Sequence, residues 1–239
     1  MRLYVYCVVN PIASPPDKPL RGLGDKEVRS IRSGKLEVLV SAFVGDNVAI
    51  TEENVVTHQR VIRSVLEFTT PLPFRFGTLV TESQLSSYLE SRQVALLEKL
   101  DALQGCVEMS VKVIWPTPEI TAVNSDDQSQ RSGTAFLAAK KEEILGDATL
   151  SQRAGDLSLW LSGHLGGLVR EEQVNLRPRD RLVLAASHLV EREQLSAYKL
   201  GLGAARAERP ELHFLVSGPW PPYSFANIDL EFKSQFGVS

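Results

Sequence analysis

TESQLSSYLESRQVALLEKLDALQGCVEMSVKVIW, residues 81–115, changes its hydrophobic period partway along and so decides the fold class. In the first part leucines recur at helical spacing, and Thr81 and Gln84 form a capping-box pattern. Gly105 suits the C-terminal end of that helix. From Cys106 onward apolar and polar residues alternate, which is typical of a strand with one buried and one solvated face. The segment therefore predicts a long helix that leads into a sheet strand.

The sequence before this helix alternates between strand and helix patterns. LYVYCVVN is apolar on both alternating faces, which is typical of a buried central strand. A later hairpin is expected to turn at Ser33-Gly34. The expected elements are a strand at 3–10, a hairpin at 28–43, a helix at 53–68 and an extended segment at 72–80.

The composition shifts to polar, turn-forming residues at 116–133, which predicts a linker. Beyond it we expect helical segments at 134–170, a strand at 181–191, a helix at 192–209 and a closing strand at 212–220. The predicted division is an N-terminal α+β domain at 1–115, the linker, and a C-terminal helical and α+β domain at 134–239 with a Pro-rich aromatic tail. The fold class is α+β, with mostly antiparallel sheets and helices on one face.

The overall composition excludes several classes of protein. Hydrophobic residues make up 43% and charged residues 23% of the chain, which is typical of a globular protein with a full core. The net charge of −3 argues against a polyanion-binding protein. With only two cysteines, no secretory signal and no apolar run near ~18 residues, we expect a cytoplasmic protein that contacts no membrane.

No pattern of reactive residues predicts catalysis. Cys7 and Cys106 lie in expected strands as small buried hydrophobes. The four histidines have no metal-ligand spacing, and His164 is expected to be a core residue. GLG at 22–24 lacks the other residues of a phosphate-binding loop. We therefore predict no enzyme, with no catalytic, cofactor-binding or metal-binding residues and no cofactor.

Basic residues gather in two parts of the chain, and they leave an alternative function open. A sheet with basic edges could form an RNA-binding ferredoxin-like module, although the RNA-stacking aromatic motif is missing. The simpler interpretation is that these charges discourage edge-to-edge aggregation. The residues are Arg21, Lys26, Arg29, Arg32 and Lys35 in the first part and Arg177, Arg179 and Arg181 in the second.

Two aromatic, proline-containing segments are candidates for partner binding. In LPFRFGTL, an extended backbone would place both phenylalanines on one face and Arg75 on the other. In SGPWPPYSF, three prolines predict a stiff extended arm that lies over its own domain or contacts another protein. The partner-binding candidates are Phe74, Arg75, Phe76, Trp220, Pro221, Pro222, Tyr223 and Phe225.

These segments also carry a family resemblance. LPFRFGTL, followed by a long helix and VKVIW, resembles the N-terminal half of the gas-vesicle synthesis F/L family (GvpF/GvpL), and GPWPPYSF resembles its C-terminal signature. GTAFLAAKK (133–141) and AASHLVERE (185–193) are similar to further family segments, so the likeness spans nearly the whole chain. Phe136 stands where the family more often has tyrosine.

The resemblance implies a non-enzymatic, chaperone-like accessory protein of gas-vesicle assembly. It implies the hydrophobic shell protein and other vesicle assembly proteins as partners, no nucleic acid, and a cytoplasmic location on gas vesicles. It also implies at least one modified ferredoxin-like fold, modified because a hairpin precedes the first helix. Besides the aromatic segments, the solvated strand face of Glu108, Ser110 and Lys112 is a candidate contact surface.

Overall fold

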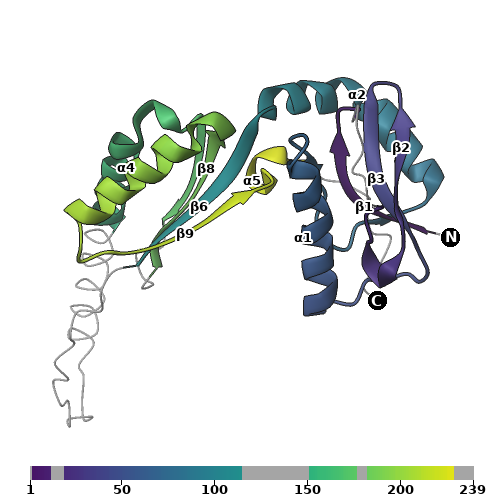
Figure 1. Ribbon diagram of the computed structural model, residues 1–239, viewed down its shortest axis with the longest axis horizontal. Coiled ribbons are helices and arrows are strands. Elements are labelled where there is room, and N and C mark those ends of the chain that lie inside the picture. Colours follow the sequence, from purple (N-terminus) through teal and green to yellow (C-terminus); the bar gives the residue numbers. More distant parts are fainter. Residues whose placement is uncertain (1, 12–18, 115–150, 177–181, 229–239) are drawn as a thin grey trace, which may run out of the picture. The chain divides into compact units, whose positions relative to one another are not determined.

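The computed structural model describes residues 2–11, 19–114, 151–176 and 182–228. Their contacts form two compact units (Figure 1), and each combines helices with a sheet. The first unit contains the chain up to Glu108 and from Pro219 onward, and the second contains Met109–Gly218. The expected α+β class is confirmed. The expected tail groups with the first unit, and the expected linker lies outside the described residues.

The first unit is built on a five-stranded sheet. Strands follow the order β2-β3-β1-β4, and β5 also pairs with β1; the pairs of β1 with β3, β4 and β5, and of β2 with β3, are antiparallel. The hairpin β2–β3 precedes the first helix, as expected. The elements are β1 (Arg2–Val9), a 3-10 turn (Leu23–Asp25), β2 (Val28–Ser33), β3 (Leu36–Phe43), α1 (Glu52–Leu66), β4 (Leu72–Pro73), β5 (Leu79–Val80), α2 (Glu82–Leu103) and α5 (Tyr223–Ala226).

Helices cover both faces of the central strands β1 and β3. Val61, Ile62 and Val65 of α1 pack with Tyr4 and Tyr6 on one face. The opposite face is also buried, because every residue of β3 from Leu36 to Ser41 is buried, whichever face its side chain points to. Helix α2 contacts β1, β2 and β3. The expectation of helices on one face therefore does not hold in this unit, because β1 and β3 are apolar on both faces. Within the described residues, the central strands β1 and β3 therefore have no exposed face on which RNA bases could stack.

The start of α2 carries the capping box that the sequence predicts. The Thr81 hydroxyl accepts a hydrogen bond from the Gln84 N–H at 3.2 Å, and the Gln84 side chain accepts one from the Thr81 N–H at 2.8 Å. These bonds satisfy two of the backbone donors that a helix leaves unpaired at its N-terminus.

Thr81→Ala is expected to lower the free energy of unfolding by about 1 kcal/mol, because the Gln84 N–H loses its acceptor. Urea unfolding followed by circular dichroism measures the change. Ser87→Ala, at an exposed site of the same helix, is the matched control. Equal midpoints for the two variants would show that the cap does not stabilise the unit.

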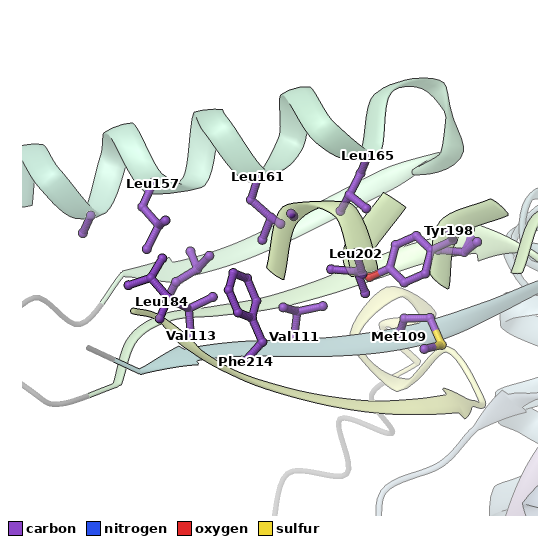
Figure 2. Close-up of a cluster of buried hydrophobic side chains, with 14 residues drawn as sticks. Met109, Val111, Val113, Leu157, Leu161, Leu165, Leu184, Tyr198, Leu202 and Phe214 are labelled. Carbon is purple, nitrogen blue, oxygen red and sulfur yellow. The ribbon is translucent and has the colours of Figure 1, made fainter. Parts of the chain in front are cut away.

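The second unit has a four-stranded sheet in the order β7-β8-β6-β9, with β7 and β8 antiparallel. Its described helices lie on one face of the sheet, as the sequence predicts (Figure 1). Figure 2 shows Leu157, Leu161 and Leu165 pointing toward the sheet residues Val111 and Phe214. Strands β6 and β9 each have residues in both units. The elements are β6 (Cys106–Ile114), a helix over residues 151–165, a 3-10 turn (Gly166–Leu168), β7 (Glu171–Leu176), β8 (Leu182–Glu191), a 3-10 turn (Arg192–Gln194), α4 (Leu195–Glu208) and β9 (His213–Trp220).

Candidate functional site

The first aromatic segment forms a tight turn between two short strands, both of which pair with β1. The Phe74 N–H donates to the Tyr6 carbonyl at 2.8 Å, and the Val5 N–H donates to the Thr78 carbonyl at 3.1 Å. Between them, the Thr78 hydroxyl donates to the Arg75 carbonyl at 2.7 Å and closes the turn. Arg75 is exposed at this turn.

The turn separates the two phenylalanines that were expected to share a face. Phe74 is buried and its ring lies 6.1 Å from Tyr88 of α2. Phe76 is half-buried and lies 5.7 Å from His58 of α1. The expectation of one shared face is wrong because β4 ends at Pro73, so the period of two no longer applies at Phe76. Phe74 is a core residue in this structure.

Phe76 belongs to a buried cluster of aromatic rings and hydrogen bonds around His58. The Gly77 N–H donates to the Tyr4 hydroxyl at 3.2 Å, and the same hydroxyl shares a hydrogen bond of 2.8 Å with Nδ1 of His58. Nε2 of His58 is buried and has no hydrogen-bond partner within the described residues. Burial lowers the pKa of His58 to about 4, and the Phe74 backbone partly offsets this effect.

GLG at 22–24 serves the same cluster and is not a phosphate-binding loop. The Leu23 N–H donates to the Tyr6 hydroxyl at 3.0 Å, and a Cβ at position 22 would collide with that hydroxyl. Gly24 has a φ of 59°, which favours glycine. Gly22 thus permits a close approach of the backbone to Tyr6, and Gly24 permits the turn that follows it.

The second aromatic segment ends strand β9 and then forms a short helix. The Arg63 guanidinium lies over the Trp220 ring, 5.8 Å from its centre. Pro221 and Pro222 are buried, and Tyr223 begins α5. The expected extended arm is thus wrong beyond Pro222, because the N–H groups of Phe225 and Ala226 turn back to the Pro222 carbonyl.

A buried carboxylate fixes this short helix to the first unit. Glu108 accepts hydrogen bonds from the Ser224 N–H at 2.8 Å and from the Ser224 hydroxyl at 2.7 Å. Glu108 is only 7% exposed. The expectation that Glu108 shares a solvated strand face with Ser110 and Lys112 is therefore wrong for Glu108, because α5 covers its side chain. Ser110 and Lys112 do line an open hollow of about 550 Å³ on the second sheet, together with Gln173, Asn175, Ala185 and Ser187.

The structure brings the two aromatic segments together, since α5 contacts β4. Four of the eight predicted binding residues are buried, namely Phe74, Pro221, Pro222 and Phe225. Arg75 and Tyr223 are exposed, and Trp220 and Phe76 are half-buried. The sequence does not predict that Arg63, Glu108 and Ser224 hold the second segment in place, because their partners lie far away in the chain.

In the second unit, a histidine joins three elements through buried hydrogen bonds. His188 of β8 is fully buried, with Nδ1 at 2.7 Å from the Tyr198 hydroxyl and Nε2 at 3.1 Å from a Glu172 oxygen. The other Glu172 oxygen accepts from the Ser162 hydroxyl at 2.9 Å. Burial lowers the pKa of His188, while Glu172 opposes the shift. With both nitrogens satisfied and no exposed atom, His188 is a structural residue.

His164 was expected in the core, but it lies at the surface of the helix pair. Its Nε2 forms an ion pair with Glu208 at 2.7 Å, and Glu208 also accepts from the Trp160 indole N–H at 3.1 Å. Hydrogen bonds that the ring donates to the Trp160 carbonyl and to Glu208 raise the pKa of His164. The expectation is wrong because the helix over residues 151–165 contacts α4 at this position through polar groups, namely Trp160, His164 and Glu208.

The described residues contain no group of three or more side chains that could hold a metal ion. Cys7 and Cys106 are both buried with free thiols, and burial raises the pKa of Cys7. Of the eight predicted binding residues, those with exposed or half-buried side chains are aromatic or cationic, namely Arg75, Phe76, Trp220 and Tyr223.

The match to a known family covers both units. The family model for the gas vesicle synthesis protein GvpL/GvpF matches residues 2–227. The chain belongs to this family. The segments 72–79 and 217–225 thus lie within the family match, and they meet where α5 contacts β4.

Relatives of both branches of the GvpL/GvpF family match at similar identity. Gas vesicle protein L2 of Halobacterium salinarum is 28% identical over 256 residues, which cover 93% of this chain and 90% of the relative. Gas vesicle protein F1 of the same organism is 28% identical over 218 residues, covering 90% and 88%. The crystal structure of GvpF from Anabaena sp. PCC7120 has the same fold, with a TM-score of 0.79 and 22% identity over 95% of this chain and 99% of that one.

Within the described residues, no helix combines sufficient length with sufficient apolar character to cross a membrane.

Proposed function

We propose that this protein is a non-enzymatic accessory factor of gas vesicle assembly that binds the hydrophobic shell protein and helps to nucleate or build the shell. The observation that carries the proposal is the family match, which extends from residue 2 to residue 227 and so includes both units. Other vesicle assembly proteins are further partners, and the site of action is the cytoplasm, at gas vesicles.

The physical requirement for such a factor follows from the shell itself. A protein that forms a gas-excluding wall exposes apolar surface before it is incorporated, and that surface needs a temporary partner. Binding needs complementary aromatic, aliphatic and cationic groups, and it needs no cofactor and no metal. His58, His188 and both cysteines are buried, so none of these four side chains is accessible to a ligand at the surface.

We place the contact surface at Arg75, Trp220 and Tyr223. Arginine, tryptophan and tyrosine contribute most often to binding energy at protein interfaces. The buried candidates Phe74, Pro221, Pro222 and Phe225 then act indirectly, because they hold these side chains in position, and half-buried Phe76 lies beside them.

The proposal can be tested by co-purification. The tagged full-length chain is co-expressed with the shell protein, and the bound shell protein is quantified after capture. We expect the wild type to retain it, and we expect Trp220→Ala with Tyr223→Ala, or Arg75→Ala, to weaken retention about tenfold, since each removes a hot-spot side chain.

Leu159→Ala with Leu200→Ala is the matched control, because both leucines are exposed, at 75% and 76%, in the second unit. Arg153→Ala is the corresponding control for Arg75. Circular dichroism verifies that every variant folds. If the wild type fails to retain the shell protein, the proposed function is wrong; if the folded aromatic variants retain it fully, only the assigned surface is wrong.

A further inference from the structure

Strand β2 lies at the edge of its sheet. It pairs with β3 on one side, and within the described residues its outer side is paired only at its beginning. There the Val28 N–H donates to the Leu20 carbonyl at 2.9 Å, and the Gly22 N–H donates to the Lys26 carbonyl at 2.7 Å.

This short pairing reveals which backbone groups of β2 point outward. Because Val28 bonds outward and strand residues alternate, the backbone groups of Ser30 and Arg32 also point away from β3. Both residues are exposed. The outer side of β2 therefore presents a template of N–H and C=O groups onto which a further strand could add.

Four cations surround this open edge. Lys26 and Lys35 lie at its two ends, and Arg29 and Arg32 lie along it; all four are exposed. None of them forms an ion pair within the described part of the chain. Arg29 and Arg32 are three positions apart, so their side chains lie on opposite faces of the sheet. An added strand would thus meet a cation on each of its faces.

The charges decide which strand fits. A second copy pairing through its own β2 would place arginines and lysines beside one another, and like charges across a strand pair are destabilising. A nucleic acid would be attracted by the positive charges, but its backbone cannot form the ladder of hydrogen bonds that an added strand forms. In addition, β2 carries no aromatic side chain on which bases could stack. An extended protein segment with carboxylates satisfies both the backbone groups and the cations.

We propose that the outer edge of β2 binds an extended segment of an acidic partner protein by strand addition, with carboxylates three positions apart opposite Arg29 and Arg32. This inference is independent of the proposed function, since it uses a different surface.

The test uses the full-length protein and a blocked, fluorescently labelled heptapeptide of Thr and Val with two carboxylates three positions apart. Anisotropy titration measures its affinity. An isomer with the carboxylates two positions apart should bind about threefold more weakly, because only one carboxylate then faces an arginine. Arg29→Glu with Arg32→Glu should weaken binding about tenfold, and Arg92→Glu with Arg153→Glu, an equal change of charge elsewhere, should leave it unchanged.

Ser30→Pro separates strand addition from simple attraction of charge. It removes an outward N–H and leaves the ladder with β3 intact, because that N–H faces away from β3. We expect about a tenfold loss of affinity with no loss of far-ultraviolet circular dichroism. Full binding by folded Ser30→Pro, equal binding of the two peptide isomers, competition by oligouridylate with equal affinity, or no binding at all would each overturn the proposal.

Discussion

Replacing Glu108 with alanine is expected to release the C-terminal aromatic segment and to cost about 3 kcal/mol of unfolding free energy. The carboxylate accepts two hydrogen bonds from Ser224, and bonds to a charged acceptor contribute about 1.5–3 kcal/mol each. Phe225, which is 1% exposed, lies next to this anchor and would lose its burial. Urea unfolding measures the stability, and limited proteolysis after Tyr223 or Phe225 reports the release.

Glu108→Gln is the informative companion to this variant. The glutamine oxygen can accept from the Ser224 N–H while its amide donates to the Ser224 hydroxyl, so both bonds are kept and only the charge is lost. We expect Gln to cost about 1 kcal/mol and to leave the segment protected from proteolysis. If the alanine variant is as stable and as protected as wild type, Glu108 does not anchor the segment.

The anchor also links stability to the proposed binding surface. Trp220 and Tyr223 flank the buried prolines, so their positions depend on the attachment of α5. Glu108→Ala should therefore also weaken shell-protein retention, although Glu108 itself is buried. The loss would follow from displacement of the contact residues.

Elements governed by local rules could be predicted from the sequence. Strand β1 follows from a continuous apolar run, and α2 follows from its leucine spacing and from the Thr81–Gln84 capping box. By contrast, β7 was missed because EEQVNL is a polar edge strand without an alternating apolar face. Local pattern is sufficient only where at least one face of an element is apolar and buried.

The candidate site was predicted only in part, because its geometry depends on contacts between distant residues. The aromatic segments could be singled out, but the turn closed by Thr78 and Arg75 sends Phe74 and Phe76 to different neighbours. Glu108 looks solvated in an alternating strand, and its burial depends on Ser224, 116 positions away. No signal in the sequence around Glu108 identifies that partner.

The stability of the first unit is expected to fall as the pH is lowered from about 6.5 to about 4. Burial lowers the pKa of His58 to about 4, whereas an unfolded histidine has a pKa near 6.5. In this interval the unfolded chain binds a proton that the folded chain does not, so acid favours unfolding. A difference of about 2.5 pH units corresponds to about 3 kcal/mol, fully present as stability above pH 6.5 and lost near pH 4.

The physical cause of this dependence is the closed cluster around the ring. The buried ring is hydrogen-bonded to the Tyr4 hydroxyl at Nδ1, and Nε2 lacks a partner within the described residues, so the charge of a second proton would be poorly stabilised. His58→Asn removes the titration while it keeps an oxygen near the position of Nδ1. We expect the variant to be less stable at pH 7 and the gap to wild type to narrow steadily toward pH 4, as measured by urea unfolding at a series of pH values. Parallel stability curves for the two proteins would mean that His58 is protonated in the folded state as readily as in the unfolded chain, and the cluster would then tolerate the charge.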